Sequence, residues 1–198
     1  MLLVVIEPWT DADLELLRRI NTPEMKAHLG GPETEEQVLA RHGRYLRFPE
    51  AGQGCMFSVR LRESGEAVGS VGYAEKVWRG EPIFEMGWNV LPKFQGRGLA
   101  AQAAAAAAAN AARTGGLRWL HAFPSVGNKA SNAVCRRVGF ELVGECDFEF
   151  PPGQLMRSND WRLDLPVVSS RGVTHQPANG HGHSNSEYDG GYGGPVPD

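Results

Sequence analysis

Two glycines, Gly96 and Gly98, stand just before an alanine-rich run that has the composition of a helix. Glycine adopts positive φ angles easily and allows the backbone to come close to a ligand. The first turn of a helix also has unpaired N–H groups and the positive end of the helix dipole. We therefore expect the backbone amides of the segment Gln95–Ala100 to bind an anion such as a phosphate group.

The charges around this loop favour the same ligand. From Met86 to Phe140 the chain has no aspartate or glutamate, although these acids make up 23 of its 198 residues. Seven basic residues lie in the same segment: Lys93, Arg97, Arg113, Arg118, Lys129, Arg136 and Arg137. Since the whole chain has a net charge of −3, this segment is a basic region of an otherwise acidic protein, and such a region attracts anions.

Length and composition limit the class of protein. A chain of 198 residues with 41% hydrophobic residues suits one domain with a substantial core. No stretch approaches the ~20 apolar residues of a membrane helix, and the N-terminal residues do not have the features of a signal peptide. Three widely spaced cysteines do not form a metal motif, so no metal site is expected. They do not form a disulfide framework either, and together with the lack of signal-peptide features this predicts a cytoplasmic protein. Its weak acidity disfavours binding to nucleic acid.

Hydrophobic periodicity and turn residues predict the elements that position the loop. The expected strands are Leu2–Ile6, Phe57–Leu61, Ala67–Lys76, Pro82–Val90, Arg118–Phe123, Glu141–Phe150 and Asn159–Leu165. The expected helices are Asp11–Ile20, Thr34–Arg47, Leu99–Arg113 and Asn128–Val138. This order predicts an α+β domain with one mixed sheet over residues 1–166. Residues 167–198 are rich in Gly, Ser, Asn and Pro and are expected to form a disordered tail.

Three kinds of phosphate-binding loop have glycine-rich patterns that this segment can match or fail to match. The P-loop pattern G-x-x-x-x-G-K-[ST] does not occur in the chain. The run Gly96–Ala101 does satisfy the dinucleotide pattern G-x-G-x-x-A. That fold, however, needs an acidic residue about 20 positions later and places its loop after the first strand of the domain. Neither condition is met, so a dinucleotide fold is disfavoured.

A third kind of loop explains more of the chain. The motif Gln95-x-x-Gly98-x-Ala100 follows the run Glu85–Pro92, and farther on come Asn128-x-x-Ser131 and Val138-Gly139-Phe140. At these spacings the chain resembles the GNAT superfamily of N-acetyltransferases over roughly residues 5–165. The spacing is most similar to that of the ribosomal-protein N-terminal acetyltransferases, the Rim-type branch.

The resemblance implies a mostly antiparallel sheet flanked by helices, in which two central strands splay apart. The pantetheine arm of acetyl-coenzyme A would lie between these strands, and the glycine loop would bind its pyrophosphate. The implied cofactor-binding residues are Trp88, Asn89, Val90, Gln95, Gly96, Arg97, Gly98, Leu99, Ala100, Asn128 and Ser131. Lys93 would add positive charge near the pyrophosphate, and Arg136 or Arg137 would meet the 3′-phosphate.

The implied reaction is direct transfer of acetyl to a primary amine in a ternary complex, which requires a base to remove a proton from the amine. Glu85 and His121 are the candidate bases, and for each the alternative is a structural hydrogen-bonding role. Relatives often place a tyrosine acid seven residues after the asparagine, but here that position is Cys135. Ser131 is therefore the better candidate to hydrogen-bond the departing thiolate, and Cys135 is expected to be a buried apolar residue.

The acceptor amine is not defined by the sequence. Glu145, Asp147 and Glu149 share one face of a predicted strand, where they either attract a cationic amine or form a solvated surface. A protein N-terminus and a small-molecule amine both remain open, as does the choice between monomer and homodimer. The missing tyrosine also keeps a second hypothesis open, a non-catalytic acyl-coenzyme A sensor on the same fold.

Overall fold

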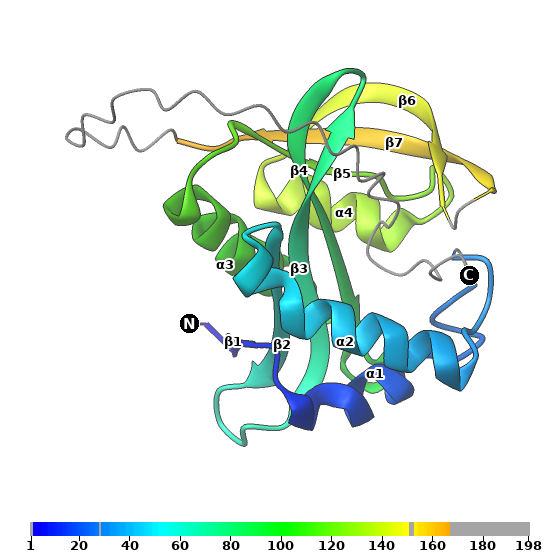
Figure 1. Cartoon of the computed structure of the whole chain (residues 1–198), viewed down its shortest axis with the longest axis vertical. Coiled ribbons are helices and arrows are strands. Elements are labelled where there is room, and N and C mark those ends of the chain that lie inside the picture. The colour runs from blue at the N-terminus through cyan, green and yellow to red at the C-terminus, as the bar shows by residue number, and fades with distance from the viewer. Residues whose placement is uncertain (1, 28, 151–152, 167–198) are drawn as a thin grey trace, which may run out of the picture.

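The computed structural model describes residues 2–27, 29–150 and 153–166. In this part of the chain, seven strands form one sheet in the order β1-β2-β3-β4-β5-β7-β6 (Figure 1). The strands are β1 (Val4–Pro8), β2 (Gly54–Leu61), β3 (Ala67–Trp78), β4 (Glu81–Val90), β5 (Trp119–Ala122), β6 (Glu141–Glu149) and β7 (Leu155–Asp164). All neighbours are antiparallel except β4 and β5. The predicted α+β class and mostly antiparallel sheet are confirmed; the tail expected at 167–198 lies outside the described residues.

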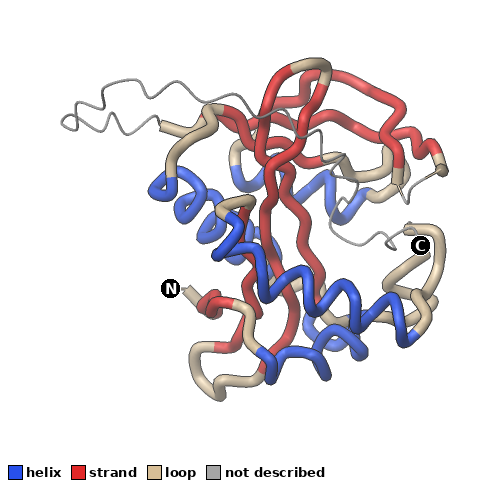
Figure 2. Tube along the Cα trace, in the orientation of Figure 1, coloured by secondary structure: helices blue, strands red, loops and turns tan. Residues whose placement is uncertain are grey.

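Helices cover both faces of this sheet (Figure 2). They are α1 (Leu14–Ile20), α2 (Glu35–Ala51), α3 (Leu99–Thr114) and α4 (Lys129–Val138), with short 3₁₀ turns η1 (Asp11–Asp13) and η2 (Pro92–Phe94). α1 and α2 lie on one face, and α3 and α4 lie together on the other (Figure 1). None of the helices in the described ranges has the length and apolarity needed to cross a lipid bilayer.

The two largest differences from the predicted element boundaries are at the end of α2 and at the start of β7. α2 was expected to end at Arg47, yet it continues through Pro49 to Ala51. A proline inside a helix loses one backbone hydrogen bond, but here Phe48 is buried in the core and Gly52 ends the helix in the left-handed conformation. β7 begins at Leu155 rather than at Asn159 because its first residues pair with the end of β6. In both cases tertiary contacts outweigh the local signal.

β4 and β5 diverge at the centre of the sheet. Their parallel pairing has only two registered positions, Phe84 with Leu120 and Glu85 with His121. β4 continues to Val90 and remains paired with β3 over its whole length. The edge of β4 after Glu85 therefore faces an opening instead of a strand, which confirms the predicted splay.

The alanines of α3 explain how this helix packs on the sheet. Five of them belong to the main buried core: Ala103, Ala104, Ala107, Ala108 and Ala111. Small side chains allow a helix backbone to approach its neighbour closely. Tyr73 of β3 also donates a hydrogen bond from its hydroxyl to Asn110 Oδ1, at 2.7 Å. These contacts fix the direction in which the first turn of α3 points.

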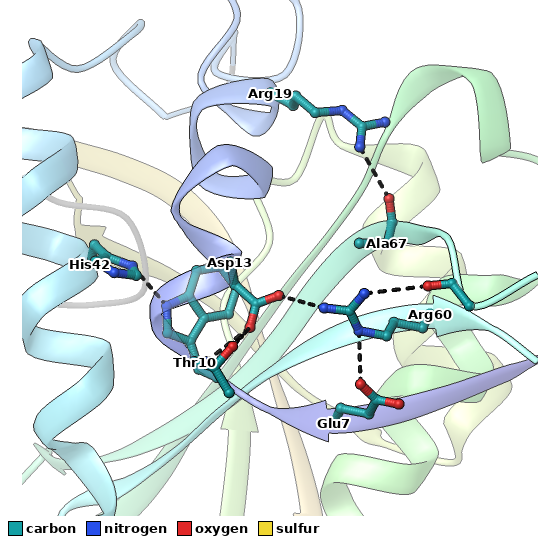
Figure 3. A network of polar contacts seen from close by, with 9 residues as sticks. Glu7, Thr10, Asp13, Arg19, His42, Arg60 and Ala67 are labelled. Carbon is teal, nitrogen blue, oxygen red and sulfur yellow. Dashed lines mark hydrogen bonds and ion pairs between the residues drawn. The ribbon is translucent and has the colours of Figure 1, made fainter.

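A polar network ties the N-terminal elements together (Figure 3). The buried carboxylate of Asp13 accepts hydrogen bonds from the N–H and hydroxyl of Thr10, at 2.9 and 3.0 Å, and from Arg60 Nη2 of β2, at 2.8 Å. Arg60 Nε also lies 2.8 Å from Glu7 Oε2 of β1. The network holds η1, from which α1 continues, against β1 and β2.

Candidate functional site

A cleft of about 630 Å³ opens where β4 and β5 diverge. Its lining comes from both faces of the sheet: α3 and α4 on one side, and the α1–α2 linker on the other. The ends of β4 and β5 and the β6–β7 hairpin complete it. The cleft thus passes through the sheet, so a ligand entering from one face can meet a second ligand entering from the other.

The glycine loop lies at the α3 end of this cleft. Gly98 is the N-cap of α3 with φ 75° and ψ 10°, and Gly96 has φ 73°. The Gln102 N–H donates to the carbonyl of the N-cap Gly98, which is the first i to i−4 hydrogen bond of α3. The N–H groups of the turn before Gln102 therefore have no acceptor within the helix. The loop residues that line the cleft are Gln95, Gly96, Gly98, Leu99 and Ala100. This arrangement of amides suits a phosphate group.

The basic side chains near the loop divide into two groups. Arg137 lines the cleft, and its guanidinium lies close to Gly98, where a Cβ atom would come within 3.5 Å of Nη1. Arg136 instead lies over the ring of Trp161, at 5.8 Å. Arg97 and Lys93 are exposed and are not part of the lining. Of the two arginines considered for a phosphate contact, the structure brings only Arg137 to the loop.

The exposed edge of β4 forms the wall between loop and sheet. Trp88, Asn89 and Val90 all line the cleft. Gln95 holds the loop against this edge, because its Nε2 donates a hydrogen bond to the Val90 carbonyl at 2.8 Å. Backbone groups on an unpaired strand edge are available to a ligand with amide groups, and the pantetheine arm has such groups.

α4 supplies the opposite wall. Asn128 caps the helix, accepting a hydrogen bond on Oδ1 from the Ser131 N–H at 3.0 Å, and both residues line the cleft. Cys135 lies farther along α4 but is buried in the core and is not among the lining residues. Burial raises the pKa of this thiol to about 12, so it is protonated at neutral pH. Its neighbour in the chain, Val134, lines the cleft instead.

Glu85 brings a carboxylate to the cleft. It lines the cavity and is only 8% exposed. Lys76 Nζ of β3 lies 3.3 Å from Glu85 Oε2. Burial raises the pKa of Glu85 above its usual value of 4.5, and the Lys76 ammonium opposes that rise. A buried carboxylate with a raised pKa is suited to accepting a proton.

His121 lies beside Glu85 in the sheet but is not part of the cleft lining. Its Nδ1 is 2.7 Å from Asp160 Oδ1, and its ring stacks on Phe123. Burial tends to raise the pKa of Asp160, but hydrogen bonds from His121 and from Trp78 Nε1, together with nearby positive charge, lower it overall. The structure therefore places His121 in a buried pair, in keeping with the structural alternative.

The acidic face of β6 points away from the cleft. Arg157 of β7 forms ion pairs with Glu145 at 3.0 Å and with Asp147 at 3.3 Å. Glu149 accepts a hydrogen bond from the Gly153 N–H. None of these three carboxylates lines the cavity, whereas the alternating residues Phe148 and Phe150 do. The three acids form the solvated strand surface that was the second interpretation of this pattern.

Sequence reasoning missed the residue that anchors α4, the buried Asn132. Its Oδ1 accepts hydrogen bonds from Asn159 Nδ2 at 2.6 Å and Trp161 Nε1 at 2.8 Å. Its Nδ2 donates to the carbonyls of Ser125 and Asn128, at 2.9 and 2.8 Å. The side-chain amide thus makes four hydrogen bonds, which join α4 to β7 and to the loop after β5. An asparagine in mid-helix was the only local signal.

We expect the substitution Asn132→Leu to lower the free energy of unfolding by about 2–4 kcal/mol, because it leaves buried partners such as the Trp161 N–H unsatisfied. Urea denaturation followed by circular dichroism measures this change. Lys129→Ala, at an exposed position of the same helix, is the control and should stay within about 0.5 kcal/mol of the parent. Equal stability of the two variants would contradict the anchoring role.

No group of three or more His, Cys, Asp or Glu side chains that could hold a metal ion occurs within residues 2–27, 29–150 and 153–166.

Comparisons with known proteins agree with this geometry. Residues 4–141 match the family model described as acetyltransferase (GNAT) domain. No curated protein matches the sequence.

Several solved structures share the fold. One is RimL, a ribosomal L7/L12 alpha-N-protein acetyltransferase in complex with coenzyme A, at 19% identity and a TM-score of 0.68, covering 83% of this chain and 96% of that one. An acetyltransferase from Agrobacterium tumefaciens is 25% identical with a TM-score of 0.68, covering 81% and 90%. The microcin C7 self-immunity acetyltransferase MccE, in complex with acetyl-CoA and AMP, is 16% identical with a TM-score of 0.67, covering 82% and 93%. The family model spans most of the chain, and the protein belongs to the GNAT acetyltransferase family.

Proposed function

We propose that this protein transfers the acetyl group of acetyl-coenzyme A to a primary amine, directly and within a ternary complex. One observation carries the proposal: a single cleft joins the glycine loop on one side of the sheet to the buried carboxylate of Glu85 in the splay. The neighbours solved with coenzyme A or acetyl-CoA support the identity of the donor.

The donor would lie along the α3 and α4 side. Amides of the segment Gln95–Ala100 bind the pyrophosphate, and Arg137 adds a positive charge at Gly98. The open edge of β4 bonds the pantetheine amides between Trp88 and Val90, and Asn128 contacts the same arm from α4. The thioester then reaches the splay, where the acceptor enters from the α1–α2 side.

The chemical step needs one base and one proton donor. Glu85 takes a proton from the ammonium form of the acceptor, directly or through one water, and the neutral amine attacks the thioester carbonyl carbon. The C–S bond breaks as the amide C–N bond forms, and the electron pair leaves on the thiolate. The attacking nitrogen loses its second proton, which protonates the departing thiolate to the coenzyme A thiol. The hydroxyl of Ser131, which lines the cleft, donates a hydrogen bond to this thiolate.

A non-catalytic acyl-coenzyme A sensor is the second candidate. The Lys76–Glu85 ion pair favours it, because the carboxylate already has a cationic partner in the described structure. The burial of Cys135 also leaves no thiol acid in the cleft. A sensor would bind the cofactor without releasing thiol.

Isothermal titration with acetyl-coenzyme A, combined with a thiol-release assay over a panel of amines, separates these candidates. Binding with amine-dependent thiol release supports the transferase. Binding without release for any amine supports the sensor, and absence of binding at millimolar ligand contradicts both.

We expect a pH dependence that reports on Glu85. The carboxylate must be ionised to accept a proton, so kcat/KM should fall as the pH is lowered through its pKa, which burial places above 4.5. The substitution Lys76→Met removes the ammonium that opposes this rise, so the acidic limb should move to higher pH. Rate profiles from pH 5 to 9 test this, and a limb that does not move in Lys76→Met would contradict the role of the ion pair.

A further inference from the structure

The half of the cleft that faces the α1–α2 linker has an apolar lining. Six side chains form it: Met25, Leu29, Phe123, Phe148, Phe150 and Met156. The rings of Phe123 and Phe148 are stacked, with centroids 4.3 Å apart and planes inclined by 12°. Leu29 and Met156 pack against the same aromatic cluster. This wall is therefore held in place by its own contacts before any acceptor binds.

The charges in this half are few. Among the described lining residues, Glu24 and Glu85 are the only acids and Arg137 is the only strong base. Glu24 is exposed at the rim, and Arg137 lies at the glycine loop on the donor side. Glu85 is already paired with Lys76. Among the residues that the structure describes, the interior of the acceptor half thus holds one carboxylate, and none of their cations there is left to pair with an acceptor carboxylate.

We propose that the acceptor is a monoamine that carries a large apolar group next to its reactive nitrogen. This inference rests on the proposed acetyl transfer. A second buried ammonium, as in a polyamine or an aminoglycoside, would lie without a carboxylate partner, and an uncompensated charge is costly to bury. An aromatic or long aliphatic group would instead be removed from water against Phe148, Phe150 and Met156.

Two classes of acceptor have these groups: an arylalkylamine, and a peptide whose first residue has a large apolar side chain. We would measure kcat/KM at saturating acetyl-coenzyme A for 2-phenylethylamine, for a tetrapeptide amide that begins with phenylalanine, and for ethylamine, spermidine and kanamycin. One or both apolar amines should exceed ethylamine by about 10- to 100-fold. The faster of the two identifies the class of acceptor. Faster acetylation of spermidine or kanamycin overturns the inference and leaves the proposed acetyl transfer standing.

A pair of neighbouring residues on β7 provides a matched test. Met156 is half-buried in the cleft, while Leu155 is 75% exposed and is not part of the lining. Met156→Glu should lower kcat/KM for 2-phenylethylamine at least about 10-fold and raise that for spermidine. Leu155→Glu should change neither. Met156→Leu, which keeps an apolar side chain, should retain the parent preference. Equal effects of Met156→Glu and Leu155→Glu would overturn the inference.

Binding measurements decide the case in which no amine is acetylated. 2-Phenylethylamine and spermidine are then titrated into the full-length protein loaded with coenzyme A. Tighter binding of 2-phenylethylamine, weakened by Met156→Glu and not by Leu155→Glu, supports the apolar acceptor site even though acetyl transfer has failed. Tighter binding of spermidine, or no binding of either amine, overturns it.

Discussion

The variant Glu85→Gln is expected to acetylate an amine about 100- to 10,000-fold more slowly than the parent, with unchanged affinity for acetyl-coenzyme A. Glutamine has nearly the shape of glutamate but cannot take up a proton from the acceptor. Glu85 lies in the cleft on the side of the sheet that faces the α1–α2 linker, away from the glycine loop. Donor binding should therefore be insensitive to the change, and the loss should appear in kcat.

The control for this variant is Glu81→Gln. Glu81 is exposed at the start of the same strand and is not part of the cleft lining, so its substitution should leave turnover within about twofold of the parent, as for most surface changes. Steady-state kinetics and titration calorimetry measure the two quantities separately. If Glu85→Gln retained parental kcat, the proton would have to leave by another route, and Glu85 would not be the base.

The second large effect is expected at Gly98. The variant Gly98→Glu should weaken acetyl-coenzyme A binding by at least about 100-fold, because it places a negative charge a few ångströms from the pyrophosphate. The new side chain would also start 3.5 Å from the Arg137 guanidinium and compete with the phosphates for it. Gly98→Ala adds a Cβ at an ordinary contact distance, so it should cost far less affinity.

Gly52→Glu is a closely matched control. Gly52 has φ 67° and ψ 11°, almost the same left-handed conformation as Gly98, with nothing within 4 Å of an added Cβ. The two substitutions therefore impose a similar backbone strain of about 1–2 kcal/mol. Only the change at position 98 should affect the affinity measured by calorimetry. A similar loss in both variants would mean that strain, and not the charge in the loop, explains the effect.

The elements and the donor loop could be predicted because their signals are local. Gly98 needs a left-handed conformation, and Asn128 caps the helix that follows it. Each of these depends on residues within one or two turns of chain. The ends of elements were less predictable where burial outweighed a local stop signal, as at Pro49 in α2.

The acceptor half of the site depends on contacts between distant residues. Glu85 and His121 are paired neighbours in the sheet, and their local sequences did not distinguish a base from a structural residue. Asp160, 39 positions after His121, holds that imidazole in a buried pair, while Glu85 borders the opening. Only the register of β7 against β5 brings Asp160 there.

Long-range packing also explains why the two adjacent arginines, and the two faces of β6, have different surroundings. Arg136 and Arg137 are adjacent in sequence, and only the packing of α4 against β7 sends one to Trp161 and the other to the glycine loop. The sequence by itself predicted the order of elements and the glycine turn before α3, because periodicity and turn chemistry are short-range. It indicated the family through the motifs that it shares with GNAT acetyltransferases. The tertiary structure alone decided which side chains share the cleft, because strand register and helix packing are set by the whole buried core.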